Sequence, residues 1–141
     1  MRSKRILIAC QDDKCLRSLG TLFHGIGYKV EKTREVSEMI HKIRKGNMSV
    51  ILLDDEIEGI KAWDLVPLLK INPRVQIIVI SSEESLGLVK RLRGTGIFYQ
   101  AMKPFDLGEI KSAVECAFGK IERESVKEGF FSFLVPEMVP A

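Results

Sequence analysis

Cysteine is scarce in this chain, and its few copies are poorly spaced for metal binding or cross-linking. The 141 residues include three cysteines, Cys10, Cys15 and Cys116. None is paired at the short spacing that binds zinc, and an odd number cannot all form disulfides within one chain. The sequence therefore predicts small buried thiols in a reducing compartment, and we expect the protein in the cytoplasm.

Long hydrophobic runs are absent too. No stretch approaches the ~18 apolar residues of a membrane-spanning helix. The basic start followed by Ile6–Cys10 has the look of a lipoprotein signal, but its apolar part is shorter than the roughly 7–15 residues that a signal peptide needs. We therefore expect neither a cleaved signal nor membrane binding.

Neither sign of charge dominates the chain. It has 22 Lys and Arg residues and 19 Asp and Glu residues, which gives a net charge of +3. This small excess favours a mixed, solvated surface over a nucleic-acid patch, so direct DNA binding is not expected. With 45% hydrophobic residues, the chain can build the core of one domain.

What the sequence does contain is an alternation of short apolar runs with helix-patterned stretches. The expected strands are 5–10, 28–33, 49–54, 74–81 and 96–102, and the expected helices are 12–27, 34–46, 62–71, 84–94 and 106–124. Such alternation predicts an α/β fold with a parallel sheet covered on both faces. The common doubly wound order is 2-1-3-4-5, which places a crevice at the carboxyl ends of the first and third strands.

Polar side chains follow four of the predicted strands, at the edge where that crevice lies. They are Cys10–Asp13, Asp54–Glu56, the pair Ser81 and Ser82, and Lys103 in "MKPF". Carboxylates bind hard cations such as Mg²⁺, whereas a lysine and a hydroxyl can hold phosphoryl oxygens. An aspartate in this setting can be the nucleophile that forms an aspartyl phosphate. A nucleotide-binding enzyme is disfavoured because no glycine-rich loop follows the first strand.

The segments "LLDDEIEGIKAWDL", "IIVISS" and "MKPF" resemble the receiver domains of bacterial two-component response regulators, of the chemotaxis-receiver type. The resemblance covers about residues 4–123 and implies a flavodoxin-like (βα)5 fold. It implies that Asp54 is the phosphoacceptor, because Gly59 then falls in the expected loop. It also makes Ser81 the switch hydroxyl and Lys103 the contact to the phosphoryl group. Lys103–Pro104 matches the family's cis peptide bond.

The same resemblance implies a Mg²⁺ site, although a weakened one. Its ligands would be Asp54, Asp12, Gln11 and the backbone carbonyl of Glu56. The family's paired acids fall on Cys10 and Gln11, so about two formal charges are missing. Two further departures are Glu58 in place of a loop proline and Gln100 in place of a switch aromatic.

Two functions therefore stay open. The first is a phosphorelay switch that accepts a phosphoryl group from a sensor histidine kinase or a phosphotransfer protein. It would be a signalling module rather than a metabolic enzyme, limited to self-phosphorylation and autodephosphorylation. It would present the face of the fourth helix, fifth strand and fifth helix to a downstream protein, and a homodimer is possible. The alternative is a degenerate receiver that binds partners without phosphorylation.

The domain limits follow from the same pattern. Residues 1–124 form the predicted receiver, without internal repeats or linkers. Residues 125–141 form an apolar tail that contains Pro136 and Pro140 and that we expect to be either docked or disordered. His24 and His41 lie on helix patterns away from the predicted site and are not expected to donate phosphoryl groups.

Overall fold

Five parallel strands form a single sheet at the centre of the computed structural model, which describes residues 4–46, 48–82 and 86–134. These strands are β1 (Arg5–Ala9), β2 (Lys29–Thr33), β3 (Val50–Asp54), β6 (Gln76–Ser81) and β7 (Tyr99–Met102). Their order in the sheet is β2-β1-β3-β6-β7. Counted along the chain, this is the 2-1-3-4-5 order, so the predicted fold class is confirmed.

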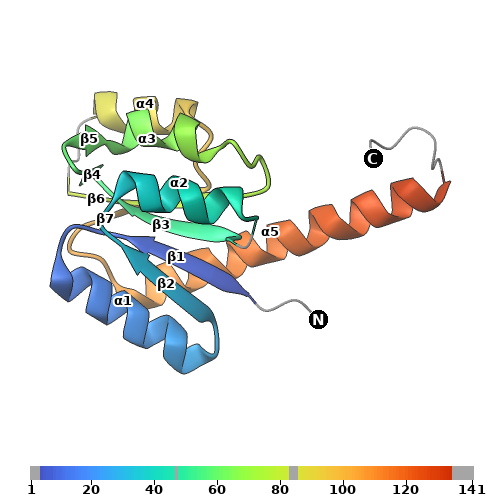
Figure 1. The fold of residues 1–141 in the computed structure, drawn as a ribbon, viewed down its shortest axis with the longest axis horizontal. Coiled ribbons are helices and arrows are strands. Elements are labelled where there is room, and N and C mark those ends of the chain that lie inside the picture. The colour runs from blue at the N-terminus through green and yellow to red at the C-terminus, as the bar shows by residue number, and fades with distance from the viewer. Residues whose placement is uncertain (1–3, 47, 83–85, 135–141) are drawn as a thin grey trace.

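Helices cover both faces of the sheet (Figure 1). They are α1 (Asp13–Ile26), α2 (Val36–Arg44), α3 (Ala62–Leu69), α4 (Leu86–Gly94) and α5 (Leu107–Leu134). α1 and α5 lie on one face, and α2, α3 and α4 lie on the other (Figure 1). This arrangement leaves the carboxyl ends of all five strands at one open edge, where loops can carry a site.

Two apolar layers hold the sheet between the helices. In β1, Ile6 and Ile8 pack on the side of α1 and α5. The alternate residues Leu7 and Ala9 pack on the side of α2 and α3. Every residue of Val50–Asp54 is buried. Burial on both faces explains why the central strands read as continuous apolar runs.

A short hairpin between β3 and α3 was not predicted. Its strands are β4 (Glu56–Ile57) and β5 (Ile60–Lys61), which pair antiparallel. The two turn residues, Glu58 and Gly59, have φ angles of 53° and 79°. Positive φ at both positions is what a two-residue type I′ turn requires. Two-residue strands are too short to show any periodicity, so sequence patterning could not reveal them.

The last helix is longer than the predicted 106–124. α5 runs to Leu134, so the predicted end of this helix at residue 124 is too early. The physical reason is that the prolines disfavour helix only from the residue before Pro136 onward. Residues 135–141 lie outside the described part of the chain. Figure 1 shows the second half of α5 extending beyond the sheet.

None of the helices in the described ranges is both long and apolar enough to cross a membrane.

Candidate functional site

Asp54 is the last residue of β3, and its carboxylate lies in the crevice at the carboxyl edge of the sheet. Its side chain is only 7% exposed. It lies there because β3 is the middle strand, bonded to β1 on one side and to β6 on the other. The strand thus delivers a carboxylate to the point where the chain's crossovers change direction, which is the usual ligand position of this architecture.

Four protein donors satisfy the two carboxylate oxygens of Asp54. Oδ1 accepts from Lys103 Nζ at 2.5 Å and from the backbone N–H of Asp55 at 2.8 Å. Oδ2 accepts from Cys10 Sγ and from the backbone N–H of Gln11, both at 3.2 Å. Because a buried carboxylate without partners is costly, these donors are what permits a charge in this position.

The Asp54–Lys103 pair is held in its ionised form. Burial raises the pKa of Asp54, but the hydrogen bonds from Lys103, Cys10 and Asp55 outweigh it and bring the pKa below its usual value. Burial likewise lowers the pKa of Lys103, and the bond to Asp54 more than reverses this effect. At neutral pH the site therefore contains an anionic carboxylate beside a fixed cation.

Backbone contacts place Lys103 next to Ser81. Ser81 ends β6 and is fully buried, and its carbonyl oxygen accepts the backbone N–H of Lys103 at 2.7 Å. Asp54 pairs in register with Ile80, the residue before Ser81. The peptide bond between Lys103 and Pro104 is cis, as the resemblance implied. The structure thus brings together the three residues that were expected to act on a phosphoryl group.

Cys10 occupies one of the two positions where an acid was expected. Its side chain is 2% exposed and its thiol donates to Asp54. Contact with the Cys15 thiol, burial and the negative charge of Asp54 all raise the pKa of Cys10. Cys10 therefore remains a protonated thiol, which acts as a donor to the carboxylate and not as an anionic ligand.

Gln11 and its neighbours are engaged with the loop after β2. The Gln11 side-chain amide donates to the carbonyl of Arg34 at 3.4 Å, and the Arg34 guanidinium donates to the Gln11 carbonyl at 3.4 Å. Arg34 also pairs with Asp13. Asp12 caps α1 by accepting the backbone N–H of Lys14 at 3.0 Å. These contacts join the loop after β2 to the start of α1.

Comparisons with known proteins place this site in a family. The model of the response regulator receiver domain matches residues 6–115. The chain belongs to this family. It is a receiver domain of two-component signalling, a signalling module and not a conventional enzyme.

Curated relatives of this receiver include both long and short proteins. It is 32% identical over 119 residues to the DNA-binding transcriptional regulator NtrC of Azospirillum brasilense, covering 83% of this chain and 24% of that protein. The receiver therefore spans about a quarter of that regulator's length. It is 23% identical to sporulation initiation phosphotransferase F of Bacillus subtilis (strain 168), covering 82% of this chain and 94% of that protein.

Solved structures show the same fold. A CheY-like receiver domain protein from Methanospirillum hungatei JF-1 superposes with a TM-score of 0.81 at 23% identity, covering 86% of this receiver and 98% of that chain. The receiver domain of an HD domain-containing protein from Pseudomonas fluorescens Pf-5 reaches 0.82 at 17% identity, covering 89% and 93%.

Receiver domains typically bind Mg²⁺, but the residues of this receiver do not fit such a site. Of the expected ligands, Asp54 is bonded to four protein donors, one oxygen of Asp12 caps α1, and the Gln11 amide bonds to the Arg34 backbone. Glu56 lies in β4 and its side chain pairs with Lys61 at 3.1 Å, whereas the role expected for its backbone carbonyl stays a prediction. Within the described ranges, no three His, Cys, Asp or Glu residues are grouped so that they could hold a metal ion.

Two acidic residues near the site were not assigned a role from sequence. The carboxylate of Asp55 accepts the backbone N–H and the hydroxyl of Ser82 at 2.8 and 2.6 Å. Glu58, which replaces the loop proline, accepts the backbone N–H of Val36 at 2.6 Å. The only sequence signal was an unusual density of acids after β3, and it does not say what each one contacts.

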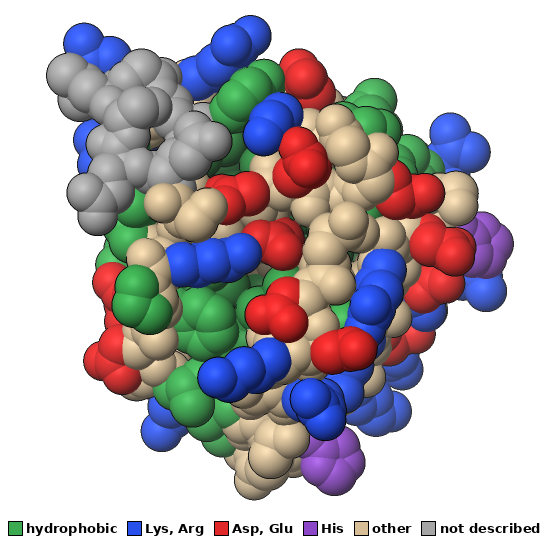
Figure 2. All heavy atoms as spheres, turned by 90° about the vertical axis from the view of Figure 1, so that its left-hand side faces the viewer, with side chains coloured by type: hydrophobic (Ala, Val, Ile, Leu, Met, Phe, Trp, Pro, Cys, Tyr) green, Lys and Arg blue, Asp and Glu red, His purple; other side chains and the backbone are tan. Residues whose placement is uncertain are grey.

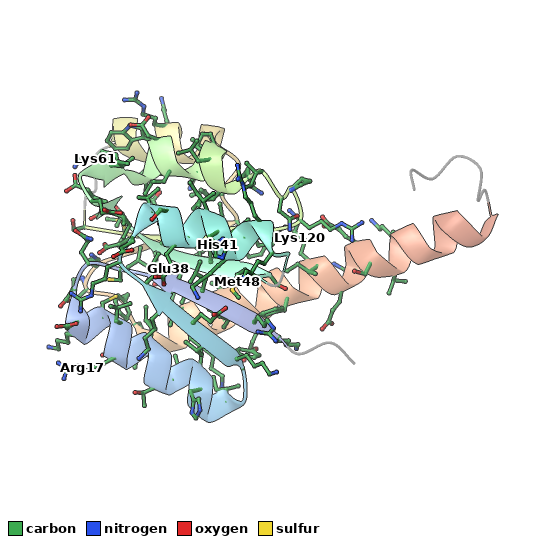
Figure 3. The ribbon with its side chains drawn as sticks, in the orientation of Figure 1. Arg17, Glu38, His41, Met48, Lys61 and Lys120 are labelled. Atoms are coloured by element: carbon green, nitrogen blue, oxygen red, sulfur yellow. The ribbon has the colours of Figure 1, made fainter. Side chains whose placement is uncertain are left out.

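The face that carries this site is mixed in charge. Figure 2 shows acidic and basic side chains interspersed at the carboxyl edge of the sheet, with apolar side chains between them. Lys61 lies at this end of the molecule, whereas His41 lies farther along α2 (Figure 3). Both His24 and His41 are exposed, in keeping with their expected position outside the site.

Proposed function

We propose that this receiver accepts a phosphoryl group on Asp54 from the phosphohistidine of a sensor kinase or a phosphotransfer protein. The observation that carries the proposal is the ionised Asp54 carboxylate at the end of β3, with Lys103 Nζ 2.5 Å away. An oxygen of Asp54 attacks phosphorus, the phosphorus–nitrogen bond of phosphohistidine breaks, and the imidazole leaves. Lys103 and the Ser81 hydroxyl are the groups we assign to the new phosphoryl oxygens.

We assign the output of the switch to the face formed by α4, β7 and α5. A groove of about 330 Å³ lies there, lined by Val89, Arg93, Ile97, Phe98, Tyr99, Gln100 and Met102. The amide nitrogen of Gln100 is buried and has no hydrogen-bond partner among the described residues. A buried donor without an acceptor is costly, so a partner that brings a carbonyl or carboxylate oxygen to Gln100 would gain affinity.

The alternative function is a degenerate receiver that binds its partner without phosphorylation. Cys10 and Gln11 favour it, because they remove the acids that a Mg²⁺-assisted transfer would use. On either proposal we place the receiver at 1–124 and the protein in the cytoplasm, and α5 carries the chain beyond that limit to Leu134. A homodimer remains part of the first proposal.

The two functions are separated by exposing the purified protein to acetyl phosphate or phosphoramidate, with and without Mg²⁺, and measuring its intact mass. We expect an adduct of ~80 Da, the mass of one added phosphoryl group, and we expect Asp54→Asn to lose it. Asp55→Asn serves as the matched control and should keep the adduct. An unmodified wild-type protein in both conditions would reject phosphorylation by these donors and leave the degenerate receiver as the better account.

A further inference from the structure

Asp55 connects the phosphoacceptor to the loop that follows the switch hydroxyl. A single oxygen of its carboxylate, Oδ2, accepts the backbone N–H of Ser82 at 2.8 Å and the Ser82 hydroxyl at 2.6 Å. Ser82 comes directly after Ser81, the last residue of β6. The two contacts join segments that lie 27 residues apart in the sequence. We call this three-atom contact between Asp55 and Ser82 the Asp55 clasp.

The backbone of Asp55 is committed as well. Its N–H donates to Asp54 Oδ1 at 2.8 Å, and its carbonyl accepts the N–H of Ala62 at 2.8 Å. Asp55 is thereby fixed against the phosphoacceptor on one side and against the start of α3 on the other. Because the backbone of Asp55 is fixed, its carboxylate loses little further conformational entropy when it accepts the two Ser82 donors.

A phosphoryl group on Asp54 needs the same kind of donors that the Asp55 clasp uses. Phosphoryl oxygens form their strongest hydrogen bonds with charged groups and with backbone N–H groups. Lys103 is already at Asp54, and the next donors at the end of β6 are those of Ser81 and Ser82. The carboxylate of Asp55 carries the same sign of charge as the phosphoryl group and lies on the adjacent residue.

We propose that Asp55 is a positioning residue: a built-in anion that holds the Ser82 donors in the unphosphorylated state and competes for them with a phosphoryl group on Asp54. The competition rests on the proposed role of Asp54, whereas the clasp itself does not. The clasp keeps the backbone of Ser82 in its resting position until the phosphoryl group displaces the Asp55 carboxylate. Asp55 therefore lowers the stability of the phosphorylated state.

The first test measures the lifetime of the ~80 Da phosphoryl adduct by intact mass after the phosphodonor is removed. We expect Asp55→Ala to lengthen the lifetime by about threefold to tenfold, the equilibrium equivalent of one net hydrogen bond. Asp55→Asn keeps an acceptor oxygen without the charge and should fall between Asp55→Ala and wild type. Asp64→Ala, a change at an exposed acid in the first turn of α3, should leave the lifetime unchanged. Equal lifetimes in wild type and Asp55→Ala would overturn the competition.

The second test does not need phosphorylation. Amide hydrogen exchange at Ser82 should be slow in the unphosphorylated wild type, because the Ser82 N–H donates to Asp55. Asp55→Ala should accelerate this exchange, whereas Asp64→Ala, a change at an exposed acid of α3, should leave it unchanged. Equal exchange at Ser82 in wild type and Asp55→Ala would overturn the clasp. If no variant takes up a phosphoryl group, the proposed function of Asp54 and the competition both fail, and the exchange at Ser82 still decides the clasp.

Discussion

Asp54 is the central residue of the site, because the groups around it serve to stabilise its charge. It is charged because Lys103, Cys10 and two backbone N–H groups offset the cost of its burial. All four donors belong to the protein, so the cost of burying the charged carboxylate is offset by protein groups alone. We therefore expect changes at single donors to alter both the stability of the protein and the affinity of the Asp54 carboxylate for cations.

Lys103→Met should lower the free energy of unfolding at pH 7 by about 2 kcal/mol, because it leaves a buried carboxylate without its charged donor. Asp54 has a lowered pKa in the folded state, so its contribution is present above the unfolded value of about 3.9 and is lost as the pH falls through the folded value. Urea unfolding of both proteins at several pH values measures this. Lys61→Met, at an exposed pair, should cost less than about 0.5 kcal/mol. A difference for Lys103→Met that persists in strong acid would contradict the explanation.

The double variant Cys10→Asp, Gln11→Asp should create a cation site beside Asp54. Two carboxylates beside Asp54 repel one another without a cation and attract Mg²⁺, so we expect affinity at least about tenfold above wild type. Calorimetric titration measures the affinity, and thermal unfolding with and without Mg²⁺ should show a stabilisation specific to the double variant. Cys10→Asn, Gln11→Asn gives matched shape without charge. Similar binding by the Asn and Asp variants would mean that we have misplaced the acid pair.

At the scale of the elements, the hairpin between β3 and α3 joins its neighbours through its acids. The backbone N–H of Val36 at the start of α2 is accepted by Glu58, a residue from a different element. Glu35, the residue in the ordinary capping position, makes no side-chain capping bond. The hairpin therefore does the work of an N-cap for α2, which ties the loop beside the phosphoacceptor to the second helix.

Glu58→Ala should lower the free energy of unfolding by about 1 kcal/mol, the usual cost of losing a cap. Glutamate and alanine both carry a Cβ, so the substitution does not change the strain of the positive φ at position 58. Amide hydrogen exchange at Val36 should accelerate in Glu58→Ala, and Glu58→Gln should recover part of the protection. Glu35→Ala is the control and should leave exchange at Val36 unchanged. An equal effect of the two alanine changes would show that the helix is capped by neither.

At the scale of the whole molecule, α5 divides into a packed half and a projecting half. Ile110, Val114 and Phe118 belong to the core layer that α5 shares with α1. Residues 122–127 are exposed, and Figure 1 shows this part of the helix leaving the body of the domain. The projecting half therefore contributes little to the core, and the stability of the receiver should depend on the packed half.

A chain that ends at Glu124 should keep its midpoint of thermal unfolding to within about 2 °C, because it retains the packed half of α5. Its helical signal in circular dichroism should fall in proportion to the residues removed. Phe118→Ala is the opposite control and should cost about 3–5 kcal/mol. A large drop in the midpoint of the truncated chain would support the docked state of the 125–141 tail.

The strands and the place of Asp54 at the end of β3 could be predicted because both depend on local sequence. The apolar run of β3 ends in Asp54, and "MKPF" identifies Lys103 without reference to any other segment. The partner of Asp55 could not be predicted, since Ser82 lies 27 residues away and only the folded chain brings them together. The extension of α5 to Leu134 was missed because the exposed residues 122–127 carry no apolar stripe that would predict a helix.

The projecting half of α5 also makes the receiver a lever. The helix rises about 1.5 Å per residue, so Leu134 lies roughly 24 Å beyond Phe118 along its axis. A tilt of about 10° at the packed end would therefore move Leu134 by about 4 Å. Small rearrangements where α5 meets the sheet would thus be magnified into displacements at its far end that are large enough to separate or join two surfaces.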